Sequence, residues 1–266
     1  MNGKTLRLGL IGKDVSKSSS AAIHNFILKE LGYECEYESI SVGMDGFDSA
    51  IRRLLGDFDG FNITIPYKRD VIAYLDDVTG DALDYGAVNT VLTATGKGYN
   101  TDGVGFMQML KSAGISVAGK KVLVLGGGGS GRSTAVALKK VGAAVYMYQR
   151  RREKLLETCE ELSLLPAGQP KGGEYDILVN CTGVGMHDTV GKSPVEEGAF
   201  QGASAAIDLI YRPEKSEFLR LAEKGGLKIL NGKAMLFYQA YFADCLYLER
   251  QASEDEAERL YKKFKW

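Results

Sequence analysis

A glycine-rich turn between an apolar run and a helical pattern is the feature that most limits how this chain can fold. Residues 120–150 are KKVLVLGGGGSGRSTAVALKKVGAAVYMYQR, with an apolar run, four glycines, an amphipathic stretch and a second apolar run in that order. Two neighbouring parallel strands need a crossover connection of this length, which is usually a helix. The segment therefore predicts a strand, a turn, a helix and a second strand within a parallel sheet.

The glycines of this turn fit two phosphate-binding patterns. Gly126, Gly128 and Gly131 have the spacing of a dinucleotide-binding turn, and the same stretch is one residue away from an NTPase P-loop, with Arg132 in place of lysine. A P-loop lysine acts as a compact point charge at the terminal phosphates, whereas an arginine fork has different geometry and hydration. A P-loop enzyme also needs a later acid for magnesium, and only Asp208 could be proposed for it. We therefore favour the dinucleotide hypothesis.

The residues after the second strand of this segment indicate which dinucleotide is bound. Sites specific for NAD place Asp or Glu there to hold the ribose hydroxyls, whereas this chain has Gln149 followed by Arg150, Arg151 and Arg152. A carboxylate would repel a 2′-phosphate, and a guanidinium can bind it in a bidentate manner. The predicted cofactor is NADP(H).

Composition excludes several other classes of function. The 266 residues are 45% hydrophobic and 25% charged, and a formal net charge of −1 argues against a nucleic-acid-binding surface. The N-terminal segment does not have the pattern of a signal peptide, and no apolar run is long enough to span a bilayer. Four widely separated cysteines form no C-x-x-C pair. We expect a cytoplasmic protein without a structural metal, a nucleic-acid partner or a membrane partner.

Strand-length apolar runs and helical patterns alternate along the whole chain, which predicts an α/β protein with parallel sheets. Ser20 is expected to cap the first helix, and His24 within that helix is expected to be a packed core residue. A hairpin is expected within residues 87–102, turning at TGKG. Besides the strand, helix and strand within 120–150, strands are predicted at 6–12, 35–42, 60–65, 175–182, 203–211 and 226–230, and helices at 21–32, 47–58, 102–114, 233–251 and 254–266.

Several polar motifs near predicted strand ends occur in a family-specific order. SKSSSAAIHN, GFNITIPYK, GAVNTV and YNTDGVGF are followed by VLGGGGSGR and NGKAMLFYQA. In these motifs the sequence resembles shikimate dehydrogenase over nearly its whole length. The resemblance implies an NADP-dependent enzyme of aromatic amino-acid (chorismate) biosynthesis that reversibly reduces 3-dehydroshikimate to shikimate in a cleft between domains, as a monomer or homodimer.

The resemblance also implies a domain division and a set of site residues. A substrate-binding and catalytic α/β domain would comprise residues 1–103 and 233–266, and a Rossmann-type, doubly wound NADP-binding domain residues 104–232. Lys68 and Asp102 would be the catalytic pair, which suits the chemistry, because hydride reduction of a ketone builds negative charge on oxygen beside which a cationic proton donor should lie. The implied substrate-binding residues are Ser18, Ser20, Thr64, Asn89, Tyr211 and Gln239, and the implied cofactor-binding residues are Gly126, Gly128, Gly129, Gln149, Arg150, Arg151, Gly232 and Met235.

The chain departs from the family pattern at two positions of the serine-rich loop. Ala21 stands where the family usually has proline, and Lys17 stands where it has histidine. Substrate specificity is the prediction that these departures affect most. One alternative is therefore a relative that uses quinate, an amino-shikimate or NAD. A second alternative, from the glycine-rich turn, is a nucleotide-binding protein of P-loop type without redox activity.

Overall fold

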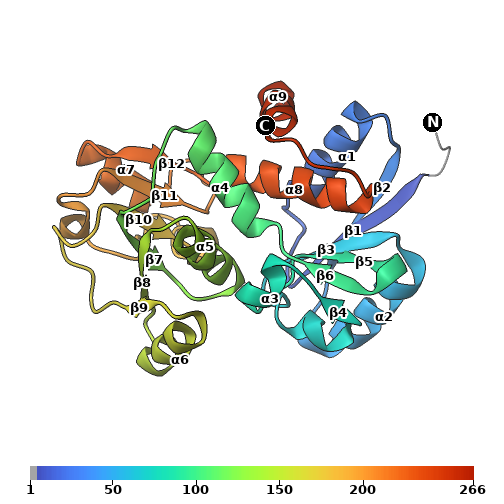
Figure 1. Cartoon of the computed structure of the whole chain (residues 1–266), viewed down its shortest axis with the longest axis horizontal. Coiled ribbons are helices and arrows are strands. Elements are labelled where there is room, and N and C mark those ends of the chain that lie inside the picture. Colours follow the sequence, from blue (N-terminus) through green and yellow to red (C-terminus); the bar gives the residue numbers. More distant parts are fainter. Residues whose placement is uncertain (1–4) are drawn as a thin grey trace. The chain divides into compact units, whose positions relative to one another are not determined.

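The computed structural model describes residues 5–266, which form two compact units (Figure 1). One unit contains the described residues up to Gln108 together with Leu236–Trp266, and the other is Met109–Met235. The boundaries lie within two helices, α4 (Asp102–Ser112) and α8 (Lys233–Tyr247), whereas the domain limits expected from the sequence are near the starts of these helices. Each of the two helices thus contributes residues to both units.

The first unit is built on a six-stranded mixed sheet in the order β2-β1-β3-β5-β6-β4. Strands β2 and β3 pair in parallel with β1, whereas β5 runs antiparallel to both β3 and β6. The β5–β6 hairpin confirms the sequence prediction and turns through Gly96, whose φ of +61° lies in the left-handed region that favours glycine. The strands are β1 (Leu6–Gly12), β2 (Cys35–Ser41), β3 (Gly60–Ile63), β4 (Asp77–Val78), β5 (Thr90–Leu92) and β6 (Lys97–Tyr99).

Helices cover both faces of this sheet, with α1 and α8 on one side and α2 on the other (Figure 1). The spacing of Phe47, Ile51 and Leu54 gives α2 one apolar face, and all three side chains are buried in the core beneath the sheet. Helix α1 begins at Ser20 itself, with Ser19 in the N-cap position and no side-chain capping bond, so the predicted capping role of Ser20 is wrong. The helical elements are α1 (Ser20–Glu30), η1 (Met44–Gly46), α2 (Phe47–Asp57), η2 (Asp70–Tyr74), α3 (Asp81–Tyr85), η3 (Thr93–Thr95) and α9 (Glu254–Lys263).

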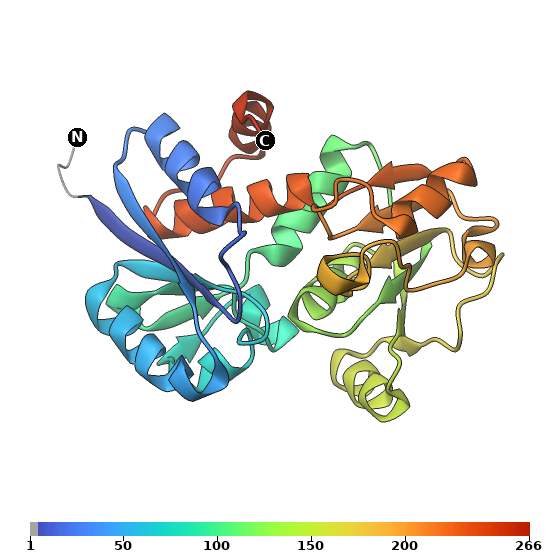
Figure 2. The same cartoon turned by 180° about the vertical axis from the view of Figure 1, so that it is seen from behind.

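An aromatic cluster joins α9 to α1 and α8, and Figure 2 shows α9 in dark red near α1 in blue. The ring of Phe264, directly after α9, lies 5.2 Å from the ring of Phe26 in α1 and 5.5 Å from that of Phe237 in α8. Ser253 caps α9 by accepting a hydrogen bond from the backbone of Glu256. The C-terminal segment therefore packs on both α1 and α8.

The second unit has a six-stranded, all-parallel sheet in the order β12-β11-β10-β7-β8-β9. The first strand along the chain, β7, lies in the centre, and the strand order reverses between β7 and β10. This is the doubly wound order of dinucleotide-binding folds, in which the ligand binds at that reversal point, and the predicted Rossmann-type fold is confirmed. The elements are β7 (Lys121–Leu125), α5 (Gly129–Lys140), β8 (Ala144–Tyr148), α6 (Arg152–Leu162), β9 (Leu165–Pro166), β10 (Ile177–Asn180), η4 (His187–Thr189), η5 (Glu197–Phe200), β11 (Ala205–Asp208), α7 (Glu217–Lys224) and β12 (Lys228–Leu230).

Candidate active site

A buried ion pair between Lys68 and Asp102 lies near the carboxyl end of β3. Lys68 Nζ donates to Asp102 Oδ2 at 2.5 Å, and the two residues are only 7% and 5% exposed. Lys68 follows Pro66 in the loop after β3, while Asp102 is the first residue of α4. A charge buried to this extent needs a partner, because its removal from water is costly. The pair thus combines a proton donor with a carboxylate that holds it.

The Lys68 loop is anchored by its neighbour, Tyr67. The Tyr67 ring is fully buried and stacks on Phe47 of α2 at a centroid distance of 4.2 Å. Its hydroxyl donates to the backbone oxygen of Val42 at 2.6 Å. Because Tyr67 is fixed by both contacts, the backbone that carries Lys68 has little freedom.

Asn89, directly before β5, donates to the other carboxylate oxygen of the pair. Its Nδ2 lies 2.9 Å from Asp102 Oδ1, 3.0 Å from Thr101 Oγ1 and 3.3 Å from Gln239 Oε1. Its Oδ1 accepts from the backbone of Thr101 at 2.9 Å. The structure therefore brings together Lys68, Asp102, Asn89 and Gln239, four of the predicted site residues.

The predicted residues Ser18, Ser20 and Thr64 also belong to the first unit. Ser18 Oγ donates to Ser20 Oγ at 3.0 Å, so the two serines form one hydroxyl pair at the start of α1. Thr64 follows β3 directly, and its backbone donates to Ile11 at the end of β1 at 2.9 Å. Tyr211 belongs to the second unit, where the Arg212 guanidinium lies 5.9 Å from its ring centroid.

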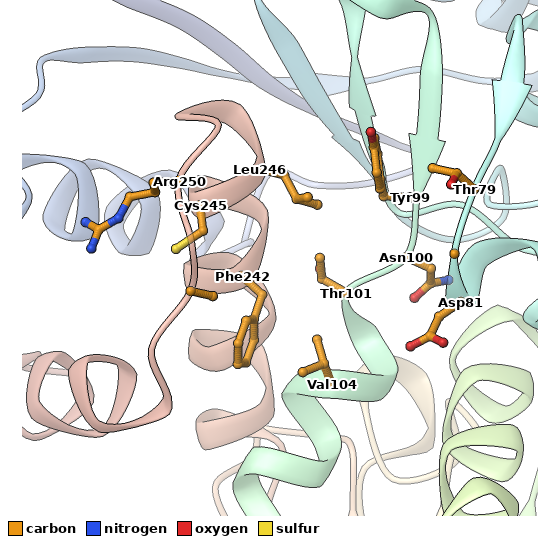
Figure 3. A pocket seen from close by; sticks show the side chains of 12 residues that line it. Thr79, Asp81, Tyr99, Asn100, Thr101, Val104, Phe242, Cys245, Leu246 and Arg250 are labelled. Atoms are coloured by element: carbon orange, nitrogen blue, oxygen red, sulfur yellow. The ribbon is translucent and has the colours of Figure 1, made fainter.

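A cavity of about 280 Å³ in the first unit lies beside this cluster without containing the ion pair. It is lined by Tyr99, Asn100 and Thr101 and by α8 residues that include Phe242 and Leu246 (Figure 3). Asn100 makes protein hydrogen bonds through both ends of its amide, to Ala87 and to the backbone of Asp102. The cavity therefore borders the segment that precedes Asp102. The candidate active site is the polar cluster around the ion pair, and the cavity is not part of it.

In the second unit, the glycine-rich turn connects β7 to α5 at the reversal point of the sheet. Gly126 has a φ of +100°, which favours glycine, and a Cβ on Gly131 would overlap the backbone of Gly126. Gly128 occupies the N-cap position of α5, and nothing lies within 4 Å of where its Cβ would be. The first N–H groups of α5 are thus accessible for an anion, together with the positive end of the helix dipole.

Arg132, the residue that suggested a P-loop, does not point a free cation at this turn. It is 1% exposed and forms an ion pair with Glu161 of α6. Asp208, the acid considered for magnesium, accepts hydrogen bonds from Ser216 at 2.5 Å and from Asn180 at 3.0 Å. Both side chains are therefore engaged in internal contacts, and the P-loop hypothesis loses the two groups on which it depended.

The turn after β8 presents the residues expected to bind a 2′-phosphate. The side chain of Gln149 lies against Gly127 of the glycine-rich turn, where a Cβ would meet it. Arg150 and Arg151 are exposed, and Arg151 is the N-cap residue of α6. Two exposed guanidinium groups that follow Gln149 in the chain are suited to a phosphate monoester.

Two further predicted residues lie where β12 leads into α8. Gly232 is buried, and a Cβ there would collide with the backbone of Leu209, so its lack of a side chain is already required by packing. Met235 is 6% exposed and apolar. A contact of either residue with the cofactor stays a prediction.

Asp208 has an unusual acidity for which the structure gives a reason. Burial raises its pKa from the usual 3.8 to about 6, while hydrogen bonds from Ser216, Ile210 and Asn180 act in the opposite direction. Because the folded-state pKa lies above the unfolded value, the stabilisation from its proton is complete below about pH 4 and is lost as the pH rises through about 6. Carbon-13 NMR of the Asp208 carboxyl should show a midpoint near 6, and a midpoint near 4 would contradict this explanation. The free energy of unfolding of the wild type, relative to Asp208→Asn, should fall across the same interval.

Two polar residues of the cluster, Asn62 and Thr101, were not predicted from the sequence. Asn62 Nδ2 donates to the backbone oxygen of Asn89 at 3.2 Å, and Thr101 binds both ends of the Asn89 amide. Both residues are buried. A signal for Asn62 was present, because an amide within the apolar strand GFNI requires hydrogen-bond partners in the core.

The described residues contain neither a membrane-spanning helix nor a metal-binding cluster. Within residues 5–266 no helix has the combination of length and apolar character that crossing a bilayer requires. The same part of the chain holds no group of three or more His, Cys, Asp or Glu side chains arranged to bind a metal ion. The four cysteines, all within the described part of the chain, form no disulfide.

Comparison with known proteins gives consistent matches over most of the chain. Residues 10–91 match the shikimate dehydrogenase substrate binding domain. The chain is 39% identical over 240 residues to a shikimate dehydrogenase (NADP(+)) of Thermus thermophilus, covering 90% of each, and 39% identical over 259 residues to that of Caldanaerobacter subterraneus subsp. tengcongensis, covering 91% of each. The crystal structure of shikimate 5-dehydrogenase from Thermus thermophilus in complex with NADP(H) and shikimate has a TM-score of 0.88 at 36% identity, over 97% of this chain and 99% of that one.

Proposed function

The chain belongs to the shikimate dehydrogenase family, and from this membership we propose that Lys68 and Asp102 carry out its proton chemistry. The protein is an oxidoreductase that interconverts 3-dehydroshikimate and shikimate with NADP(H), in the biosynthesis of aromatic amino acids. The observation that carries the residue assignment is the buried Lys68–Asp102 ion pair with Asn89 on its second carboxylate oxygen.

Reduction of a ketone requires a hydride on carbon and a proton on oxygen. NADPH supplies the hydride when bound. Lys68 donates the proton from Nζ to the substrate oxygen, and its positive charge stabilises the negative charge that develops there. Asp102 holds Lys68 in position, and Asn89 holds Asp102 by donating to Oδ1. In the oxidative direction Lys68 accepts the proton of the substrate hydroxyl.

The substrate is recognised by hydroxyl and amide groups that pair with its own carboxylate and hydroxyls. A site built in this way can reject an analogue that lacks one hydroxyl by about 10⁴- to 10⁵-fold, because its own polar groups would be left unpaired. The Ser18–Ser20 hydroxyl pair supports the proposal, since it offers two adjacent groups at the end of a helix. The proposed substrate-binding residues are Ser18, Ser20, Thr64, Asn89, Tyr211 and Gln239.

The second unit fits NADP(H) through its backbone and its exposed arginines. Gly126, Gly128 and Gly129 would hold the pyrophosphate, because the start of α5 offers accessible N–H groups without Cβ atoms. Gln149, Arg150 and Arg151 would surround the 2′-phosphate. Gly232 and Met235 would lie on the nicotinamide side. In this proposal the second unit is the NADP-binding domain and the first is the substrate-binding and catalytic domain.

The function is tested by following reduced nicotinamide when the purified protein meets shikimate and NADP⁺, with quinate and NAD⁺ in parallel reactions. We expect turnover on shikimate with NADP⁺ to exceed the other three combinations, because the hydroxyl pair and the arginines match that substrate and that cofactor. Faster turnover on quinate would assign the chain to a relative of different specificity. Absence of turnover by protein that binds NADPH would refute shikimate as the substrate.

We also propose a cytoplasmic location and a monomeric or homodimeric state, without nucleic-acid or membrane partners. The four described cysteines form no disulfide, which is compatible with a reducing compartment. Light scattering on the purified protein would determine its mass in solution.

A further inference from the structure

A second buried polar pair lies behind the active-site cluster, under the face of the first sheet that α1 and α8 cover. His24 of α1 and Asp244 of α8 are both 0% exposed, and His24 Nδ1 lies 2.6 Å from Asp244 Oδ1. Burial of such a pair costs desolvation that apolar residues of the same size would avoid. Neither residue takes part in the proposed proton transfer. The burial of this pair therefore needs an explanation other than a direct catalytic role.

The imidazole of His24 connects this pair to the sheet. Its ring stacks on the ring of Tyr37 in β2, with a centroid distance of 4.6 Å and an interplanar angle of 13°. The Tyr37 hydroxyl donates to Asn62 Oδ1 in β3 at 2.9 Å. The buried pair therefore determines where the Tyr37 ring can lie, and Tyr37 in turn contacts the amide of Asn62.

The hydrogen bonds continue from Asn62 to the active-site cluster. Asn62 Nδ2 donates to Thr90 Oγ1 at 3.1 Å, and Thr90 Oγ1 donates to Asn89 Oδ1 at 2.8 Å. Asn89 Nδ2 then donates to Asp102 Oδ1 at 2.9 Å. A continuous series of contacts thus runs from the buried pair to the catalytic carboxylate.

Strand register explains why these side chains meet. Leu8 pairs with Tyr37, Leu10 pairs with Asn62, and Asn62 pairs with Thr90. Because Leu8 and Leu10 are two residues apart in β1, their partners project from the same face of the sheet. Polar residues on three strands consequently line one face, beneath α1 and α8.

The chemistry of the donors gives the series a direction. A hydroxyl has one proton, and an amide has one accepting and one donating end. When Tyr37 donates to Asn62 Oδ1, the Asn62 NH₂ group faces Thr90, and Thr90 then uses its proton on Asn89 Oδ1. The NH₂ group of Asn89 is thereby left for Asp102.

We propose that His24, Asp244 and Tyr37 are positioning residues for the oxidoreduction. The buried pair holds the Tyr37 ring, whose hydroxyl orders the amides of Asn62 and Asn89 and so sets the hydrogen bond that Asp102 receives. This inference rests on the proposed role of Lys68 and Asp102.

Titratable groups surround both ends of the series. Facing Asp244 are His24 from α1, Tyr247 from α8, and Tyr37 and Cys35 from β2, while Lys68 and the α3 residue Tyr85 face Asp102. Burial raises the pKa of Tyr37 and of Tyr247 well above the usual value, and that of Cys35 to about 12. These three groups stay protonated at neutral pH, so the series keeps its direction there.

The first test is Tyr37→Phe, which removes the hydroxyl and keeps the stacked ring. We expect kcat for shikimate to fall about 3- to 10-fold, the equivalent of one hydrogen bond, with a smaller change in KM. The acid limb of the kcat/KM profile should move to higher pH, because a hydrogen bond to a carboxylate favours its charged form. Tyr33→Phe, at a tyrosine that is 39% exposed, is the matched control and should change neither quantity.

Variants of Asp244 test the other end of the series. Asp244→Asn keeps an oxygen that can accept from His24 Nδ1, whereas Asp244→Leu does not. The loss in kcat should therefore be larger for the leucine variant, and the asparagine variant should retain part of the wild-type rate. If both Asp244 variants lost the same fraction of kcat and neither shifted the pH profile of kcat/KM, the His24–Asp244 pair would have a purely structural role.

A measurement without turnover separates this inference from the proposed function. The side-chain amide NMR signals of Asn89, whose NH₂ group donates to Asp102, should shift in Tyr37→Phe and stay unchanged in Tyr33→Phe. Shifted Asn89 signals in a protein that does not oxidise shikimate would refute the function and support the positioning role. If the wild type turns over shikimate and Tyr37→Phe changes neither the pH profile nor the Asn89 signals, the positioning role alone is overturned.

Discussion

Lys68→Ala is expected to reduce turnover of shikimate with NADP⁺ by at least about 10²-fold, the usual scale of general-acid catalysis. Its ammonium is both the proton donor and the cation nearest to the developing oxyanion in the proposed reaction. The measurement is steady-state kcat at saturating substrates. Lys29→Ala, at an exposed lysine of α1, is the matched control and should retain the wild-type rate.

The Lys68 variant must be shown to fold, because the substitution leaves Asp102 buried without its cation. Asn89 still donates to that carboxylate, which limits the penalty. Lys68→Met, which keeps most of the side-chain volume, should show the same loss of kcat with a smaller loss of stability. A folded variant with near-wild-type turnover would remove Lys68 from the mechanism.

Replacing both Arg150 and Arg151 by glutamate should raise the KM for NADP⁺ about 10- to 100-fold and leave the KM for NAD⁺ nearly unchanged. Charge-assisted hydrogen bonds to phosphate are the stronger kind, and the new carboxylates would repel the 2′-phosphate that NAD⁺ lacks. Kinetics with each cofactor at saturating shikimate provide the measurement. The effect should weaken as salt is added, because both side chains are exposed.

Arg152→Glu is the control for this substitution. Arg152 is also exposed, and it is the first residue of α6. It is not among the residues proposed to surround the phosphate. It should change the ratio of the two KM values little. If Arg152→Glu impaired NADP⁺ as strongly as the double variant, the contribution would be a diffuse positive field instead of a defined phosphate site.

The sequence was informative where local chemistry determines structure. The glycine-rich turn predicted the strand, helix and strand that the structure shows as β7, α5 and β8, because left-handed and closely packed backbone positions demand glycine. Helices α6 and α7 were not predicted, although Leu155, Cys159 and Leu162 give α6 a buried face. The two-residue strand β9 carries too little periodicity to be recognised.

For the candidate site, the sequence indicated which residues take part, and the structure showed which of them contact one another. Lys68 and Asp102 were predicted through resemblance, and their pairing at 2.5 Å is a property of the fold. The link from Tyr37 through Asn62 depends on the register of three strands, which involves residues far apart in the chain. Asp244 gave no signal, because a single acid in an apolar helix does not identify its partner.

The division of α4 and α8 between the two units has a consequence for biosynthesis of the chain. The second unit ends at Met235, so its sequence is complete before Leu236–Trp266 have been translated. Those last residues supply Gln239 to the active-site cluster and Asp244 to the buried pair. Because domains fold as units, the first unit can fold only after its segment Leu236–Trp266 has been translated, whereas the second unit is one uninterrupted stretch of chain. Nascent protein should acquire resistance to proteolysis in the second unit first.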